Sequence, residues 1–258
     1  MLGDIVTTLR DWLRVGPFTL AMSSGFFGFY AHAGFLSVLE EEGLLPARVC
    51  GSSAGALVAG LWATGMSSTT IRERLETLRR EQFWDVGLGF GLLRGALFQS
   101  LIEAIIPARD FDACRVPLAV SAFDLRTRRT VVLRSGAVAP ALRASCALPF
   151  MFHPVRIDGR LYLDGGILDR PGLAGASPSD RVLLHHLPRS PAPDQASRLP
   201  DLRGWPQIQP VAIAGLPRVD PLRLSRGRQA IDRAADGLRA ALDRPMFTRA
   251  STPASSRE

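Results

Sequence analysis

The sequence predicts a single α/β domain of three layers, α/β/α, with a central, mainly parallel sheet. Apolar runs of strand length alternate with segments of helical periodicity in the first half of the chain, as in strands joined by helical crossovers. The chain has 258 residues, 47% of them hydrophobic, so it can bury one full core. No repeat of fixed period is visible. One large domain therefore fits the chain better than two small ones.

The first elements form a strand, turn and helix unit. Residues 4–14 have the apolar spacing of a short amphipathic helix, which either packs on its own domain or lies on a membrane surface. Residues 18–22 (FTLAM) are a strand candidate, and a turn of serine and glycine follows them. A helix is expected over 29–42, where Gly43 ends it.

A second unit centres on the motif Gly51-Ser52-Ser53-Ala54-Gly55, a G-x-S-x-G pattern. Residues 47–50 predict a short strand, and residues 54–63 (AGALVAGLWA) predict a helix. Ser53 would sit at the bend, where glycines two residues before and after it keep neighbouring Cβ atoms from colliding. The motif alone also fits an ordinary turn that opens a buried helix. If the motif forms the bend between a strand and a helix, Ser53 is a candidate nucleophile.

The rest of the chain predicts further helices and a group of strands. Helices are expected over residues 69–83, 96–106, 137–146 and 223–242. Strands are expected over residues 116–123, 130–133, 153–157, 160–163, 181–185 and 211–214. The glycine-rich residues 87–95 are expected to form a mobile connection, and residues 189–206 a polar loop rich in proline.

Charge and composition limit the possible partners. The formal net charge is +7, and every basic residue is an arginine. Such a balance permits binding to an anionic lipid surface or to nucleic acid. The arginines are scattered, however, and no basic run is interleaved with aromatic residues. We therefore expect no nucleic-acid partner.

The N-terminal residues and the cysteines indicate the cellular compartment. The N-terminus carries Asp4 and Asp11, where a secretory signal has an unbroken apolar block, and no apolar run has the length of a membrane span. Cys50, Cys114 and Cys146 lie far apart and are odd in number, which favours reduced thiols. We expect a cytoplasmic protein, with peripheral contact to a membrane left open.

A serine hydroxyl is a poor nucleophile at neutral pH, so Ser53 requires a base and donors for the oxyanion that forms on attack. The turn over residues 23–28 lies between a strand and a helix, where backbone N–H groups lack helical partners. The turn also fits a plain loop with glycines for turning. The candidate donors of an oxyanion hole are the amides of Ser24, Gly25, Phe26 and Ala54.

Two candidate bases define two different enzymes. In one, His185 or His186 completes a Ser-Asp-His triad in the order found in α/β-hydrolase esterases. In the other, Asp164 is itself the base. It ends an apolar strand, and Gly165 and Gly166 allow another backbone to approach and leave amides free to fix the carboxylate. Burial beside a serine would raise the proton affinity of Asp164.

Four segments, in this order, resemble the patatin-like phospholipase family. They are the turn and helix at 25–43 (GFFGFYAHAGFLSVLEEEG), the elbow at 51–55, residues 144–149 (ASCALP), and the triplet Asp164-Gly165-Gly166. The resemblance covers roughly residues 18–175. It implies a Ser-Asp dyad of Ser53 and Asp164 without a histidine, and an oxyanion hole in the loop that contains Gly25 and Gly28. Ser23 and Ser24 stand where the family usually has glycines.

The expected function is that of a lipid acyl hydrolase, a phospholipase or esterase that cleaves carboxylic esters through an acyl-enzyme. A lipid or ester substrate is implied, and no cofactor or metal. The triad esterase and a non-catalytic lipid-binding protein that retains the fold remain the alternatives. Several apolar residues either line an acyl site or a lipid-facing rim or belong to the core: Phe26, Phe27, Phe29, Leu88, Phe90 and Leu92.

The same interpretation divides the chain into three parts. Residues 1–17 are expected to form an N-terminal amphipathic segment, residues 18–244 the patatin-like catalytic domain, and residues 245–258 a flexible polar tail.

Overall fold

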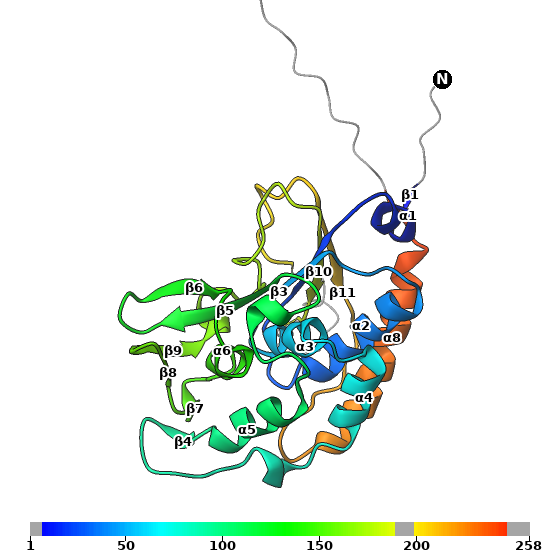
Figure 1. Cartoon of the computed structure of the whole chain (residues 1–258). Coiled ribbons are helices and arrows are strands. Elements are labelled where there is room, and N and C mark those ends of the chain that lie inside the picture. Colours follow the sequence, from blue (N-terminus) through cyan, green and yellow to red (C-terminus); the bar gives the residue numbers. More distant parts are fainter. Residues whose placement is uncertain (1–6, 189–198, 247–258) are drawn as a thin grey trace, which may run out of the picture.

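Five apolar runs of the chain form the parallel part of one central sheet. The computed structural model describes residues 7–188 and 199–246 (Figure 1). The sheet has the strand order β11-β10-β2-β3-β5-β9-β8, and β6 pairs with β5 outside this order. Its strands are β2 (Thr19–Met22), β3 (Arg48–Ser52), β5 (Leu118–Asp124), β6 (Arg129–Leu133), β8 (Val155–Ile157), β9 (Arg160–Asp164), β10 (Val182–His186) and β11 (Ile208–Ala212). Neighbours from β11 to β5 are parallel, and β6, β8 and β9 are paired antiparallel.

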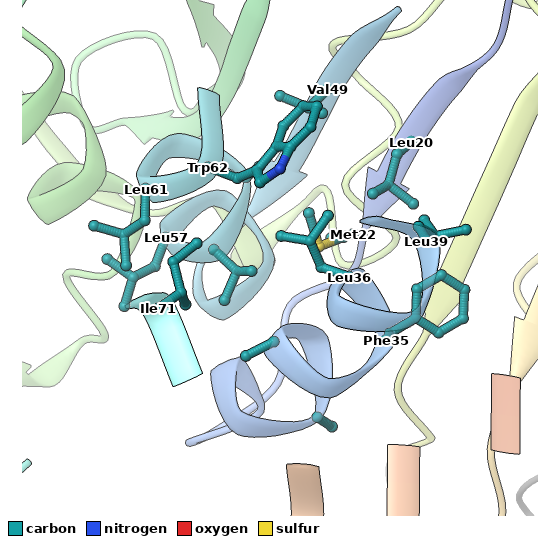
Figure 2. Close-up of a cluster of buried hydrophobic side chains, with 14 of the residues drawn as sticks. Leu20, Met22, Phe35, Leu36, Leu39, Val49, Leu57, Leu61, Trp62 and Ile71 are labelled. Carbon is teal, nitrogen blue, oxygen red and sulfur yellow. The ribbon is translucent and has the colours of Figure 1, made fainter. Parts of the chain in front are cut away.

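Helices cover one face of this sheet and enclose the main hydrophobic core. The helices are α1 (Leu9–Arg14), α2 (Phe29–Glu41), α3 (Ala54–Ala63), α4 (Ser68–Glu76), α5 (Ala96–Ile105), α6 (Val138–Ser145) and α8 (Gly227–Leu242). Leu20 and Met22 of β2 and Val49 of β3 point into the core, because alternate residues of a strand share a face. Figure 2 shows them beside side chains of α2 and α3, namely Phe35, Leu36, Leu39, Leu57 and Leu61.

The other face of the sheet carries small side chains. Ala21, Cys50 and Ala119 pack there against the segments around Leu173 and Trp205. A Cβ added at Gly175 would lie 2.7 Å from the Cβ atoms of both Cys50 and Ala119. The segments around Leu173 and Trp205 that cover this part of the sheet are irregular.

The predicted α/β class with a central, mainly parallel sheet is confirmed, while several element boundaries differ. The helix predicted over 69–83 ends at Glu76, and a 3₁₀ turn follows at Arg80–Gln82. The glycine-rich residues expected to be a mobile connection contain strand β4 (Gly91–Leu93), which pairs in parallel with β7 (Phe150–Phe152). Glycine is rare in strands, so neither propensity nor periodicity indicated this pair.

The N-terminal segment packs on the domain. Helix α1 begins at Leu9 behind the N-cap Thr8, and residues 4–6 of the predicted helix lie outside the described residues. Leu9 and Leu13 are buried in the main core. Strand β1 (Thr7–Thr8) pairs antiparallel with β12 (Pro245–Met246). The predicted boundaries at 17 and 244 stay predictions, and residues 189–198 and 247–258 of the predicted loop and tail also lie outside the described residues.

Strand β5 brings two distant parts of the chain together at one edge. Residues 120–124 of β5 pair with β6, so β3 and β9 must share the opposite edge of β5. Ser52, the last residue of β3, lies opposite Ser121, and Asp164, the last residue of β9, lies opposite Ala122. Because β3 is parallel to β5 and β9 is antiparallel, the two strands end head to head. The residues that follow them necessarily meet.

Asp169 ties the segment that covers the second face to strand β5. Its carboxylate accepts a hydrogen bond from the hydroxyl of Ser121 at 2.6 Å and from the amides of Gly172, Leu173 and Ala174 at 3.0 to 3.1 Å. Each buried donor left without this acceptor would cost on the order of 1–3 kcal/mol. One side chain thus holds the loop after β9 against the sheet.

Replacing Asp169 with alanine should therefore lower the free energy of unfolding by about 3 kcal/mol or more, measured by urea denaturation followed by circular dichroism. Asp236→Ala is the control, because the exposed Asp236 forms only surface ion pairs with Arg239. Such pairs contribute about 0–1 kcal/mol. Equal losses in the two variants would contradict the role assigned to Asp169.

Candidate active site

Ser53 occupies a strained bend between β3 and α3. Its φ of 53° and ψ of −121° lie in a region that non-glycine residues rarely adopt. Two hydrogen bonds hold the bend, one from the Ser53 amide to the hydroxyl of Ser145 at 2.8 Å and one from the Leu57 amide to the Ser53 carbonyl at 2.9 Å. The strand-to-helix elbow predicted from the sequence is therefore present.

The two glycines of the motif allow close backbone contacts around this bend. A Cβ at Gly51 would lie 2.7 Å from the amide nitrogen of Ala56, and a Cβ at Gly55 would collide with the carbonyl of Met22. Any side chain at either position would push α3 away from β3 or from β2. The glycines thus permit the tight packing that keeps Ser53 at the end of its strand.

Asp164 lies directly beside Ser53. Its Oδ2 accepts a hydrogen bond from Ser53 Oγ at 2.7 Å, and its Oδ1 accepts one from the Gly166 amide at 2.7 Å. The residue is only 4% exposed. Burial raises the pKa of this carboxyl to about 6, against the opposing effect of the two hydrogen bonds. At neutral pH the group is therefore mostly ionised, yet basic enough to accept a proton.

The glycines after Asp164 serve close contacts of the same kind. A Cβ at Gly165 would collide with the Ser121 carbonyl of β5, and a Cβ at Gly166 would collide with the Ser24 hydroxyl. The triplet therefore presses the turn after β9 against both β5 and the loop after β2. The predicted contact of another backbone with these glycines is found in the structure.

Ser145 is a site residue that sequence reasoning did not single out. It is fully buried at the end of α6, and its hydroxyl accepts the Ser53 amide and donates to the Ser121 carbonyl at 2.6 Å. Two residues later, the Ala147 carbonyl accepts the Asp164 amide at 2.9 Å. The segment after α6 thus holds both members of the pair. Its signal was the ASCALP segment, whose resemblance carried no role for Ser145.

The turn expected to form an oxyanion hole lies across from this pair. The Gly28 amide donates to the Gly25 carbonyl at 2.9 Å, and Phe27 between them has a φ of 52°. Gly25, Phe26 and Ala54 line the same cavity as Ser53. Ala54 is the first residue of α3, so its amide has no acceptor within the helix. These three amides remain candidates.

The amide of Ser24, predicted to be an oxyanion donor, is already hydrogen-bonded within the fold. It donates to the carbonyl of Arg170 at 2.8 Å and so is committed to holding the loop after β9. The residue lines the cavity through the rest of its atoms. We therefore leave Ser24 out of the candidate oxyanion donors, although the sequence placed it among them.

His185 and His186, the two histidines of the triad alternative, are both buried. His32 Nε2 lies 2.8 Å from the Ser23 carbonyl, which can only accept, so Nε2 carries the proton and Nδ1 accepts. His185 Nδ1 lies 2.9 Å from that acceptor and must therefore donate. Burial lowers the pKa of His32 to about 4 and that of His185 well below its usual value. His185 also stacks on Phe35 of α2.

Ser53 and Asp164 open into an apolar cavity of about 200 Å³. Its walls come from α3, α4, α5, β4, β7 and the segment between α4 and α5, and the apolar residues among them include Leu57, Leu61, Leu75, Phe83, Leu93, Phe98, Ile102 and Phe152. The walls formed by described residues contain no histidine. Within residues 7–188 and 199–246, no group of His, Cys, Asp or Glu side chains is placed to hold a metal ion.

The six apolar residues left open by the sequence fall into two groups. Phe26, Phe27 and Phe29 line the cavity. Leu88, Phe90 and Leu92 are exposed and lie outside the set of wall residues.

Comparison with known proteins agrees with this geometry. The family model of the patatin-like phospholipases matches residues 20–176, more than half of the chain, from β2 to the segment after Asp169. The chain belongs to the patatin-like phospholipase family. The match contains the elbow of Ser53, the ASCALP segment and the triplet of Asp164.

Curated relatives are similar to part of the chain at moderate identity. An uncharacterized NTE family protein of Mycobacterium tuberculosis, Rv1063c, is 31% identical over 161 residues, which cover 58% of this chain and 42% of that protein. The uncharacterized protein YqhO of Bacillus subtilis is 30% identical over 172 residues, covering 54% and 59% respectively. The chain thus spans about half the length of the curated relatives it matches.

The patatin-like fold is also found in a solved structure. The crystal structure of VipD from Legionella pneumophila superposes with a TM-score of 0.67 at 15% sequence identity, over 88% of this chain and 67% of that one. At this identity the likeness concerns the fold alone, and the arrangement of sheet and helices described above is shared.

The bridge made by Ser145 leads to a stability prediction for this patatin-like domain. Ser145→Ala removes the acceptor of the Ser53 amide and a donor to the Ser121 carbonyl, so the free energy of unfolding should fall by about 1–3 kcal/mol in urea denaturation. Ser37→Ala is the matched control, because Ser37 is also buried but its hydroxyl only donates to Gly34 of its own helix. If Ser37→Ala lowers the free energy of unfolding as much as Ser145→Ala does, the hydrogen bonds of Ser145 do not stabilise the fold specifically.

Proposed function

We propose that this chain is a serine-dependent lipid acyl hydrolase, in which Ser53 attacks a carboxylic ester and Asp164 is the base. The observation that carries the proposal is the 2.7 Å hydrogen bond from Ser53 Oγ to Asp164 Oδ2 at an apolar cavity. Membership of the patatin-like phospholipase family supports the same reaction class.

In the acylation step, Ser53 Oγ attacks the carbonyl carbon of the ester while its proton passes to Asp164 Oδ2. The amides of Gly25, Phe26 and Ala54 stabilise the oxyanion, a role that in other hydrolases is worth about 3–4 kcal/mol per donor. The C–O bond to the alcohol then breaks, and the alcohol leaves with the proton held by Asp164. An acyl group remains on Ser53.

Deacylation repeats these events with water. Asp164 accepts a proton from a water molecule that attacks the acyl carbon, and it returns the proton to Ser53 Oγ when the carboxylic acid leaves. The Gly166 amide holds Oδ1 throughout, so Oδ2 keeps facing Ser53. The carboxylate therefore needs no histidine to orient it or to relay its proton.

The cavity favours an acyl chain as the part of the substrate that it binds. Its walls are mostly aliphatic and aromatic, and such surfaces gain roughly 0.8 kcal/mol for each buried CH₂ group. A lipid or other long-chain ester is therefore the proposed substrate class, reached by peripheral contact with a membrane. No helix in the described parts of the chain is long and apolar enough to span a bilayer.

The site offers no support for the triad alternative. The hydrogen bond that a triad histidine would make with Ser53 is made by Asp164 instead. His185 already donates to His32 below the turn that follows β2. The lipid-binding alternative without catalysis is separated from the proposal by the following experiment.

We expect Ser53→Ala to lower kcat/KM for ester hydrolysis by roughly 10,000-fold or more, and Asp164→Asn by roughly 100- to 10,000-fold, with folding retained. A fluorophosphonate probe should label the wild type at Ser53. Ser52→Ala is the matched control, because Ser52 is the buried neighbour in the same motif and its hydroxyl has no partner among the described residues. Full activity of Asp164→Asn would reject the assigned base, and an unlabelled, folded wild type would favour a binding role.

The raised pKa of Asp164 determines in which direction kcat/KM changes with pH. The base must be ionised, so kcat/KM should fall as pH drops through the pKa of about 6 and stay level above it. The measurement is kcat/KM for a soluble ester from about pH 5 to pH 8, with circular dichroism as the check on folding. A profile that is flat over this range would contradict a base with the pKa of Asp164.

A further inference from the structure

Residues 87–93 alternate glycine with large apolar side chains, in the order GLGFGLL. Leu88 is 100% exposed and Phe90 is 88% exposed, and Leu92 is exposed as well. These residues lie in and before β4, which pairs with β7. The strands of this small sheet and the residues leading into β4, 86–93 and 150–152, are called the flap below.

The glycines of the flap lie against the rest of the protein. A Cβ at Gly87 would collide with the Arg94 side chain, one at Gly89 with the ring of His153, and one at Gly91 would lie 2.5 Å from the backbone of Phe152. A surface strand normally turns its apolar side chains inward and its polar ones to water. Here a side chain at any of the three glycines would meet a neighbouring group, and the apolar residues between them, Leu88, Phe90 and Leu92, are exposed.

Phe150 of β7 is a further exposed apolar residue of the flap. It pairs with Gly91 in the register, and the residue is 89% exposed. Its φ of 68° is strained for a bulky residue, and a phenylalanine in this conformation gains no burial in the fold that would offset the strain. Neither packing nor backbone preference explains a phenylalanine at this position.

The inner residues of the flap belong to the cavity of the proposed active site. Leu93, Met151 and Phe152 are wall residues of that cavity. The flap is anchored by Asp85, whose carboxylate accepts the amides of Gly95, Ala96 and Leu97 at the start of α5. The exposed apolar residues of the flap therefore lie close in the chain to wall residues of the proposed acyl site.

We propose that the exposed apolar surface of the flap, formed by Leu88, Phe90 and Phe150, is where the protein docks on a phospholipid membrane. The inference rests on the proposed function, because a lipid substrate must pass from a bilayer into a cavity that flap residues line. Clustered exposed apolar residues mark interaction sites. The net charge of +7 and the exposed Arg94 beside Gly87 suit an anionic bilayer surface, while the neighbouring Asp85 is engaged by α5.

The test is sedimentation with vesicles of equimolar phosphatidylcholine and phosphatidylglycerol. Each of Leu88→Asp, Phe90→Asp and Phe150→Asp should lower the partition coefficient by about tenfold or more, the loss expected when one large apolar side chain no longer enters lipid. Phe150→Asp is also safe for folding, because aspartate tolerates a positive φ better than phenylalanine does. Unchanged partitioning in all three variants would overturn the proposal.

Leu45→Asp is the matched control. Leu45 is 55% exposed and precedes β3, whereas Ser53 follows β3, so the two residues lie at opposite ends of this strand. Its substitution should leave partitioning unchanged. A loss equal to that of the flap variants would overturn the proposal, because the binding would then not be specific to the flap.

Two further measurements separate docking from catalysis. Hydrolysis of a soluble short-chain ester should be unchanged in the flap variants, and Ser53→Ala should bind vesicles as the wild type does. A wild type that binds vesicles through the flap but hydrolyses no ester would refute the proposed function and leave the docking surface standing. Light scattering tests the other occupant, a second copy of the chain. A dimer that the flap variants dissociate, with vesicle binding unaffected, would overturn membrane docking.

Discussion

The shared edge of β5 is the constraint on which the site depends. Because β3 and β9 meet head to head along it, the residues that follow Ser52 and the residue that ends β9 come within hydrogen-bond distance without any long loop. The segment after α6 then fastens both chains, through the Ser145 hydroxyl and the Ala147 carbonyl. A chemical pair separated by 111 residues in sequence is thus set by backbone pairing, and little depends on side-chain flexibility.

Electrostatics and packing support the same arrangement. Burial raises the proton affinity of Asp164, whereas the hydrogen bonds from Ser53 and Gly166 limit that rise. The glycines on either side of the pair bring backbone within contact distance of it. A G-x-S-x-G motif suggests a histidine as the partner of the serine. His185 is instead hydrogen-bonded to His32, and His32 is hydrogen-bonded to the Ser23 carbonyl, so the two rings support the loop facing Ser53.

Much of this was predictable from the sequence, and the exceptions have physical reasons. The elbow and the strands around it follow from local patterns, because glycine spacing and buried strands leave clear signatures. Local patterns left the base open between Asp164 and a histidine, and the pairing of Ser53 with Asp164 was implied by the resemblance to the patatin-like family. The roles of Ser145 and of the Ser24 amide do not, since both depend on partners distant in sequence, Ser121 and Arg170. Strand β4 was missed because Gly91 carries no strand propensity and because the pairing of β4 with β7 depends on residues distant in sequence.

The alternation of glycines and exposed apolar residues in the flap affects which of its positions can change during evolution. Leu88 and Phe90 are exposed and are not wall residues of the cavity. Substitutions at these positions replace no part of the cavity wall, whereas a side chain gained at Gly89 or Gly91 would collide with His153 or with the backbone of Phe152. Membrane docking and substrate binding would then depend on different residues, so one can change while the other is retained.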